Sequence, residues 1–341
     1  MERMIVVMDR SVSQGQIDKV VDIIKEAGLQ AHISKGEKKV IIGVIGNVAK
    51  ISREKLENLS FVEKVMSVQK PYKRASREVQ PHNSIVEAGG VRFGGNEVVM
   101  IAGPCAVESE EQMFEIANAL KKMGVRVFRS SAYKPRTSPY EFQGLGEKGL
   151  KIIKKVKEET GMVVETEVMD PRNVELIAKY VDIIRVGARN VQNYDLLKEV
   201  GKVNKPVILK NGLSTTIDEW LFAAEYIMNE GNMNVILCER GIRTFEPQTR
   251  NTLNLSAVPV IKSLSHLPII VDPCHAAGKR GPIPALSKAA IAVGADGLLI
   301  EVHNNPEKAL SDQAQQLSIP DFEKLYADLK RVALAVDRKL I

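Results

Sequence analysis

VVMIAG at residues 98–103 is the first of eight short apolar runs in the second part of the chain, and most of these runs end in polar residues. The others are VRVFRS (125–130), MVVETE (162–167), VDIIRVG (181–187), PVILKNG (206–212), MNVILCERG (233–241), LPIIVDP (267–273) and ADGLLIEVH (295–303). Continuous Val, Ile and Leu runs are typical of parallel strands buried on both faces. Helical spacing is found over 110–123, 150–160, 217–229, 283–293 and 322–340. Eight βα units in about 245 residues predict an α/β fold of the (β/α)8 TIM-barrel type.

The first seventy residues predict a separate small domain. Strands are expected over 4–8, 31–34, 38–46 and 62–69, and helices over 16–27 and 53–58. This βαββαβ order is the ferredoxin-like signature, and it contains no cluster of titratable residues that suggests chemistry. Residues 71–96 are rich in charged residues and glycine pairs, which favours a linker. We therefore expect a ferredoxin-like domain over 1–70, a linker over 71–96 and a barrel over 97–341.

Composition narrows the class of protein. The chain has 341 residues, of which 44% are hydrophobic and 26% charged, so it has enough apolar material for a large core. A net charge of +6 without an RNA- or DNA-binding motif does not indicate nucleic-acid binding. No apolar run predicts a signal peptide or a membrane span. Three cysteines, an odd count in a long chain, favour a reducing compartment, and we expect a cytoplasmic protein.

Several catalytic motifs are absent from the sequence. It has no G-x-G-x-x-G after a strand, no Walker loop, no C-x-x-C, no H-E-x-x-H and no G-x-S-x-G, which argues against nucleotide cofactors and serine hydrolysis. Cys274 stands beside His275, but adjacent side chains usually point apart, so a cysteine nucleophile is disfavoured.

Cations gather where the predicted strands end, which is the active-site face of such barrels. These cations are Arg129, Lys134, Arg189, Lys210 and Arg240. Any one of the arginines can instead pair with a rim carboxylate such as Glu165 or Glu167. Packing five like charges together is unfavourable unless an anion lies among them. The set therefore favours a substrate with several negative charges, such as a phosphorylated or carboxylated compound.

A second group of residues offers metal ligands. Cys105, His275 and Glu301 follow or end strands that neighbour one another in a closed barrel, and Asp312 precedes the last helix. A sulfur, nitrogen and oxygen donor set suits a divalent first-row metal rather than calcium or magnesium. Each residue also has an ordinary structural role open to it: core packing for the cysteine, a loop hydrogen bond for the histidine and a helix N-terminus for the aspartate. Spacing alone leaves both interpretations open.

The motifs in their order resemble one family. They are AGPCAVES (102–109), FRSSAYKPRTSP (128–139), VGARNVQN (186–193), ILKNGLS (208–214), ILCERG (236–241), DPCHAAGKR (272–280) and LLIEVH (298–303), followed by Asp312. This set resembles 3-deoxy-D-arabino-heptulosonate 7-phosphate (DAHP) synthase, the transferase that opens the shikimate pathway. Within it the chain is most similar to the subclass related to 3-deoxy-D-manno-octulosonate 8-phosphate (KDO8P) synthase. The segment Lys134-Pro135-Arg136-Thr137 resembles the erythrose 4-phosphate loop, whereas the octulosonate enzymes have an asparagine-containing segment there.

The resemblance implies an aldolase-type condensation of phosphoenolpyruvate with erythrose 4-phosphate. It implies that Arg129, Lys134, Arg189, Lys210 and Arg240 hold phosphoenolpyruvate, with Ala188 also at the substrate, and that Lys134, Pro135, Arg136 and Thr137 line the aldose phosphate site. It further implies that Cys105, His275, Glu301 and Asp312 bind a divalent metal such as Mn, Fe, Co or Zn. Lys134, Cys105 and His275 are then the catalytic residues, with Lys134 a proton donor between the substrates.

The front domain resembles the ACT-type regulatory extensions of some family members, which bind an aromatic end product between subunits. Tyrosine or phenylalanine is the expected inhibitor and a homotetramer the expected assembly, with a domain that serves only assembly or stability as the alternative. KDO8P synthase, acting on arabinose 5-phosphate, is the alternative enzyme. A catalytically silent sugar-phosphate or amino-acid sensor on the same barrel is the alternative from another class.

Overall fold

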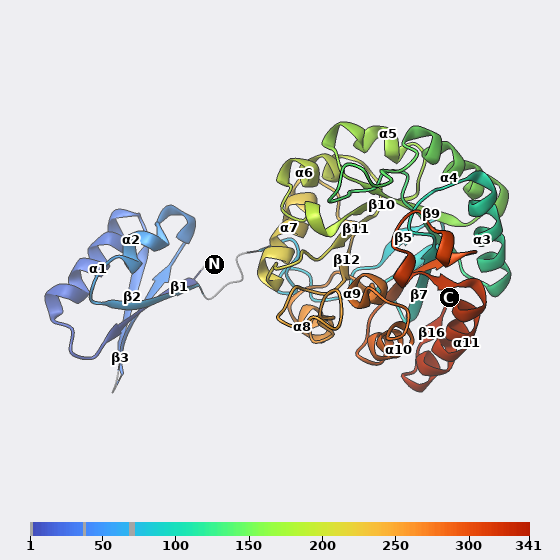
Figure 1. Ribbon diagram of the computed structural model, residues 1–341. Helices are drawn as coiled ribbons and strands as arrows, with labels where there is room; N and C mark the ends of the chain where they lie inside the picture. Colours follow the sequence, from blue (N-terminus) through green and yellow to red (C-terminus); the bar gives the residue numbers. More distant parts are fainter. Residues whose placement is uncertain (1–2, 37–38, 68–71) are drawn as a thin grey trace. The chain divides into compact units, whose positions relative to one another are not determined.

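The computed structural model describes residues 3–36, 39–67 and 72–341, and the chain divides into two compact units, residues 1–71 and 72–341 (Figure 1). None of the helices in these ranges is long and apolar enough to cross a membrane.

The N-terminal unit is a four-stranded antiparallel sheet in the order β2-β3-β1-β4, covered by two helices. Its elements are β1 (Arg3–Asp9), α1 (Gln14–Glu26), β2 (Gln30–Lys35), β3 (Lys39–Ile45), α2 (Arg53–Glu57) and β4 (Val62–Ser67). A capping box between Ser13 and Gln16 starts α1, which buries Ile17, Val20 and Ile24 against the sheet. The expected ferredoxin-like fold is confirmed; residue 38 and residues 68–69 of the expected strands lie outside the described residues.

The second unit contains the expected (β/α)8 barrel. Its parallel strands are β7 (Glu97–Gly103), β8 (Val127–Arg129), β9 (Val163–Val168), β10 (Ile183–Val186), β11 (Val207–Lys210), β12 (Val235–Glu239), β13 (Ile269–Val271) and β14 (Gly297–His303). Pairing of β14 with β7 closes the cylinder. Around it lie α3 (Glu110–Met123), α4 (Glu147–Thr160), α5 (Val174–Ala178), α6 (Tyr194–Lys202), α7 (Ile217–Asn229), α8 (Ala257–Leu264), α10 (Ile283–Ala292) and α11 (Ile319–Ala335), which form the outer ring in Figure 1.

Each barrel strand is buried on both faces, as its continuous apolar run predicts. Alternate side chains such as Ile101, Ile208 and Ile270 fill the interior, and the residues between them, such as Met100 and Leu209, pack under the helices. Because the eight strands are parallel, their polar carboxyl ends lie at one rim of the barrel.

The linker expected over 71–96 is corrected by the structure, because residues 72–96 belong to the barrel unit. Tyr72 is 1% exposed and packs edge-on against Phe222 of α7. A hairpin of β5 (Val86–Ala88) and β6 (Val91–Phe93) packs against the barrel interior. Its turn uses Gly89 and Gly90 at φ of 52° and 75°, so glycines that suggested a linker serve a tight turn.

The helix expected over 322–340 also differs. α11 ends at Ala335, and Asp337 has a φ of 56° that a helix does not allow. The chain then extends as β16 (Lys339–Leu340), which pairs in parallel with β7. Leu340 is buried by that pairing, although its distance in sequence from the apolar residues of α11 is equally compatible with a helix.

Candidate active site

A cavity of about 290 Å³ lies at the carboxyl ends of the barrel strands. Of the residues expected at the site, its lining includes Lys134, Pro135, Arg136, Thr137, Ala188, Arg189, Lys210, Arg240, His275 and Asp312. Glu141, Glu167, Arg185, Gly187 and Arg250 complete the lining. The rule that active-site residues of a barrel stand where its strands end, here called the strand-end rule, thus predicts most of the lining of this cavity from the sequence.

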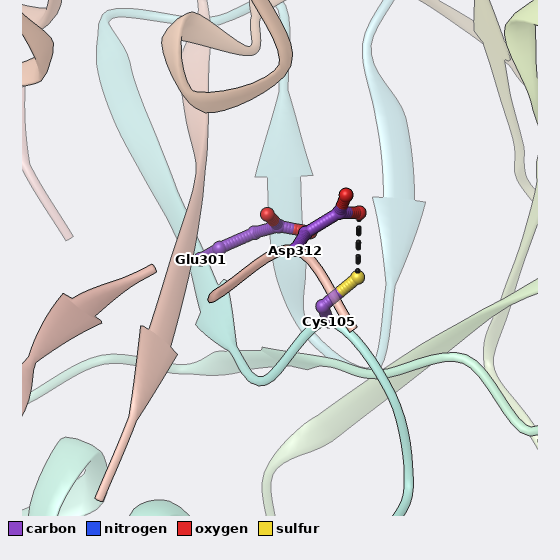
Figure 2. Close-up of side chains that lie close together, drawn as sticks. All are labelled: Cys105, Glu301 and Asp312. Carbon is purple, nitrogen blue, oxygen red and sulfur yellow. Dashed lines mark hydrogen bonds between the residues drawn. The ribbon is translucent and has the colours of Figure 1, made fainter. Parts of the chain in front are cut away.

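Three of the four expected metal ligands lie together beside the cavity. One donor atom each from Cys105, Glu301 and Asp312 falls within 4.8 Å of the others. Figure 2 shows the Cys105 thiol directed at Asp312, and its Sγ donates to Asp312 Oδ2 at 3.2 Å. Cys105 follows β7, Glu301 belongs to β14, and Asp312 adopts a left-handed backbone (φ 51°) in the loop before α11. An aspartate tolerates this conformation better than most residues, and outliers of this kind cluster at functional sites.

The fourth expected ligand, His275 in α9 (Pro273–Ala277), lies at the edge of this group. Its Nε2 is 3.6 Å from Glu301 Oε1, and its Nδ1 is 2.7 Å from Asp272 Oδ2. The backbone N–H of His275 donates to the other oxygen of Asp272, which caps the short helix. Holding Nδ1 in this way leaves Nε2 facing Glu301, which is how outer carboxylates orient metal-binding histidines.

The charges of the group favour a cation among its donors. Burial raises the pKa of Glu301, but His275 and Arg129 outweigh it and lower that pKa to about 2. Burial likewise opposes ionisation of Asp312, yet His275 and Lys134 bring its pKa below the ordinary value. Burial, with the charge of Glu301, raises the pKa of the Cys105 thiol to about 12. Two carboxylates and a thiol that ionises beside a cation are a donor set that fits a divalent first-row metal.

Lys134 connects the donor group to the cavity. Its Nζ donates to Cys105 Sγ at 2.9 Å and to the Cys105 carbonyl oxygen at 3.3 Å, and the residue is 6% exposed. Although burial lowers the pKa of Lys134, Cys105 and Glu167 raise it above the ordinary value. The ammonium group is therefore charged at neutral pH and is available as a proton donor.

Arg129 differs from the other expected substrate-binding cations, because it is fully buried and does not line the cavity. One of its terminal nitrogens donates to Glu301 Oε1 at 2.7 Å, and its Nε is 3.8 Å from Glu165 Oε1. The side chain of this β8 residue lies beneath the donor group, where it balances the Glu301 charge.

The remaining cations fall into two classes. Arg185 is paired with Glu165 at 3.0 Å and with Glu167 at 2.9 Å, and Lys210 is paired with Asp272 at 2.5 Å. Within residues 72–341, by contrast, Arg189 and Arg240 have no carboxylate partner. Arg189 reaches Thr137 Oγ1 at 3.4 Å, and Arg240 reaches only backbone oxygens. These two guanidinium groups are the ones that an anionic ligand best satisfies.

The strand-end rule missed Arg250 and Gln315. Arg250 pairs with Asp312 Oδ1 at 3.2 Å, and Gln315 Nε2 donates to Glu301 Oε2 at 2.6 Å. Both stand in long loops with no apolar run directly before them, so the sequence gives no signal for either.

Known families match both parts of the chain. Residues 67–337 match the DAHP synthetase I family, and residues 4–70 match the DAHP synthase ferredoxin-like domain. The chain belongs to the DAHP synthase family. A phospho-2-dehydro-3-deoxyheptonate aldolase of Thermotoga maritima is 49% identical over 337 residues, covering 99% of this chain and 100% of the relative. The crystal structure of the Thermotoga maritima DAHP synthase covers all of both chains with a TM-score of 0.94 and 48% identity.

Other relatives match the barrel alone. A truncated form of the Thermotoga maritima DAHP synthase covers 78% of this chain and 98% of its own, with a TM-score of 0.74 and 48% identity. The 2-dehydro-3-deoxyphosphooctonate aldolase of Syntrophotalea carbinolica is 33% identical over 266 residues, covering 72% of this chain and 95% of the relative. The chain is thus an enzyme of the DAHP synthase type, with the ferredoxin-like domain of that family in front of the barrel.

Proposed function

We propose that this DAHP synthase family enzyme condenses phosphoenolpyruvate with D-erythrose 4-phosphate. The products are 3-deoxy-D-arabino-heptulosonate 7-phosphate and inorganic phosphate, which is the first step of the shikimate pathway to the aromatic amino acids. The observation that carries the proposal is one cavity that contains both Arg189 and Arg240, which have no acidic partner among the described residues, and Asp312 of the donor group with Cys105 and Glu301. Full-length similarity to a phospho-2-dehydro-3-deoxyheptonate aldolase supports it.

We further propose that a divalent metal such as Mn, Fe, Co or Zn binds at Cys105, His275, Glu301 and Asp312. Held by these four residues, a metal would provide Lewis-acid polarisation of the aldehyde of the second substrate. The donor set supports a first-row ion, because a thiolate is a poor ligand for magnesium or calcium. His275 lies at the edge of this set, with its Nε2 at 3.6 Å from Glu301 Oε1 and its Nδ1 at 2.7 Å from Asp272 Oδ2.

The chain's own residues account for binding and proton transfer. Arg189, Arg240 and Lys210 hold the carboxylate and phosphate of phosphoenolpyruvate, while Pro135, Arg136 and Thr137 line the aldose phosphate site. A bond forms between C3 of the enol and the aldehyde carbon, and Lys134 gives a proton to the former aldehyde oxygen, which becomes a hydroxyl. Water adds at C2, and the C2–O bond to phosphate breaks to release inorganic phosphate. One of the two protons of the water goes to the released phosphate, and the other restores the Lys134 ammonium in the sum. The sum is one phosphoenolpyruvate, one erythrose 4-phosphate and one water consumed.

Substrate choice tests this function against the alternatives. We expect the metal-loaded enzyme to prefer erythrose 4-phosphate over arabinose 5-phosphate by roughly 100-fold in kcat/KM, because the segment Lys134 to Thr137 resembles the erythrose 4-phosphate loop of the family. Phosphate release and loss of phosphoenolpyruvate absorbance measure both reactions. A preference for arabinose 5-phosphate identifies a KDO8P synthase instead. No phosphate release with either sugar identifies a catalytically silent sensor.

We also propose that the N-terminal unit mediates feedback inhibition by tyrosine or phenylalanine, bound between subunits of a homotetramer. The uncovered face of its sheet supports an interface. Ile41 and Met66 are 39% and 37% exposed there, beside the half-buried Ile5 and Val7 of β1. Apolar side chains gathered on one open face mark interaction surfaces.

Deleting residues 1–71 is expected to leave an active enzyme that tyrosine no longer inhibits. The cut falls at the boundary between the two units, and the truncated Thermotoga maritima DAHP synthase is similar to the barrel that remains. Initial rates with and without tyrosine and phenylalanine check the result. Deletion through residue 75 is the informative comparison, because it also removes the buried Tyr72 and Ala75 and is expected to lower the melting temperature. An intact enzyme indifferent to both amino acids refutes the regulatory proposal.

A further inference from the structure

A second, smaller cavity of about 100 Å³ shares a wall with the active-site cavity. Four residues line both cavities: Ala188, Arg189, Arg240 and Arg250. Leu213, Arg243 and Asn251 complete the smaller one, which lacks Lys134, Lys210 and the metal donors. Water needs roughly 10–15 Å³ of such space, so the smaller cavity has room for a small polyatomic ion or a few waters.

The lining of this smaller cavity is strongly cationic. It contains four arginines and no carboxylate. Arg240 is 5% exposed, and its buried Nε has no hydrogen-bond partner among the described residues. Within the described chain, the Arg243 side chain makes neither an ion pair nor a hydrogen bond. Among the described residues, Arg250 alone of the four arginines has an acidic partner, Asp312, which lies outside the lining of the smaller cavity.

Electrostatic repulsion in this group calls for a counter-ion. Burial lowers the pKa of Arg240, Asp272 opposes that shift from outside the cavity lining, and the positive charge of Arg250 lowers the pKa further. An arginine resists deprotonation in proteins, so the repulsion is relieved by an anion rather than by loss of a proton. Guanidinium groups offer paired N–H donors that match the oxygens of phosphate.

We propose that the smaller cavity is a binding site for a tetrahedral oxyanion and receives the inorganic phosphate that the reaction releases. This assignment of the ligand rests on the proposed function, since breakage of the C2–O bond leaves phosphate beside Arg189 and Arg240. Both side chains also face the smaller cavity. Phosphate therefore moves from one set of donors to the other without losing its guanidinium contacts. Arg243, which is exposed, completes the second set on the solvent side.

Binding of radiolabelled inorganic phosphate to the metal-loaded, full-length enzyme tests the proposal. Phosphoenolpyruvate is present at saturation and the sugar phosphate is omitted, so no turnover occurs. We expect one phosphate per subunit to remain bound beside phosphoenolpyruvate. Arg243→Ala is expected to weaken that binding roughly 10- to 100-fold, and Arg243→Lys to restore part of it. Arg331→Ala is the matched control, because it removes one charge at an exposed arginine whose partner, Asp328, also lies outside this cavity.

Two results of the binding experiment overturn the proposal. Complete displacement of phosphate by phosphoenolpyruvate means that the ion uses only the substrate's own phosphate position. Unchanged phosphate binding in Arg243→Ala means that the bound ion lies elsewhere. Inhibition kinetics provide a second readout: phosphate is expected to be noncompetitive with phosphoenolpyruvate, and purely competitive inhibition contradicts the second site. Since phosphate binding is measured without turnover, its failure is distinct from failure to release phosphate in the substrate assay.

Discussion

Cys105→Ala is expected to abolish metal binding and turnover while the protein stays folded. Cys105 is fully buried, and its Sγ meets Asp312 and Lys134 in the donor group. Loss of an outer-shell partner costs a metal site about 10- to 100-fold in affinity, so loss of a direct ligand is expected to exceed that range. Metal content by elemental analysis and kcat under metal saturation measure the effect, with the melting temperature of the metal-free protein as a check on folding.

Binding of a metal to the Cys105 thiol is also expected to release a proton. The pKa of Cys105 is raised to about 12, so the thiol is protonated at neutral pH in the metal-free protein. Binding of a metal to the thiolate must then expel about one proton, which calorimetry in buffers of different ionisation enthalpy measures. Release of that proton is expected to be absent in Cys105→Ala.

Cys238→Ala is the matched control for this substitution. Cys238 is also a fully buried cysteine, but its side chain packs in the barrel interior with Ile236 and Ile270. The change is expected to cost about 1 kcal/mol of stability and to leave the metal in place. Full turnover of Cys105→Ala, or of the unaltered enzyme in rigorously chelated buffer, contradicts the metal assignment.

The sequence predicted the barrel and most of its mouth because both depend on local patterns. A strand buried on both faces must be continuously apolar, and the residue that ends the run must meet the active-site rim. Cys105 and His275 follow from that rule. The linker was mispredicted because a glycine pair also suits a tight turn, as at Gly89 and Gly90. The end of the last helix was mispredicted because residues with helical spacing can also form a strand, as β16 does when it pairs with β7.

Finer features of the site depend on contacts between distant segments. Whether a strand-end arginine lines the cavity or lies beneath it is decided by the carboxylates that surround it, and Arg129 meets Glu301 across 172 residues of sequence. Arg250 and Asp312 are likewise brought together by two loops whose residues show no periodic pattern of apolar and polar side chains. Local sequence patterns carry no record of such pairings, so the three-dimensional structure is needed to separate paired from unpaired cations.

Lys134→Gln is expected to lower kcat by about 10²- to 10⁴-fold, the usual contribution of a positioned proton donor. Lys134 is 6% exposed and its ammonium nitrogen lies 2.9 Å from Cys105 Sγ, so the side chain borders both the donor group and the cavity. Glutamine keeps much of the side-chain volume and a hydrogen-bond donor, but it has no proton to give. Steady-state kinetics under metal saturation separate kcat from the KM for each substrate.

Two comparisons distinguish proton donation by Lys134 from electrostatic positioning. Lys155→Gln removes an exposed lysine paired with Glu110 and is expected to change the rate little, since such surface pairs contribute about 0–1 kcal/mol. Lys134→Arg keeps the charge but holds its proton too tightly to donate at neutral pH, so it is expected to preserve the KM for phosphoenolpyruvate without restoring kcat. Recovery of kcat by arginine assigns to Lys134 a purely electrostatic role. If Lys134→Gln instead loses its metal, the main function of the ammonium is to stabilise the Cys105 thiolate.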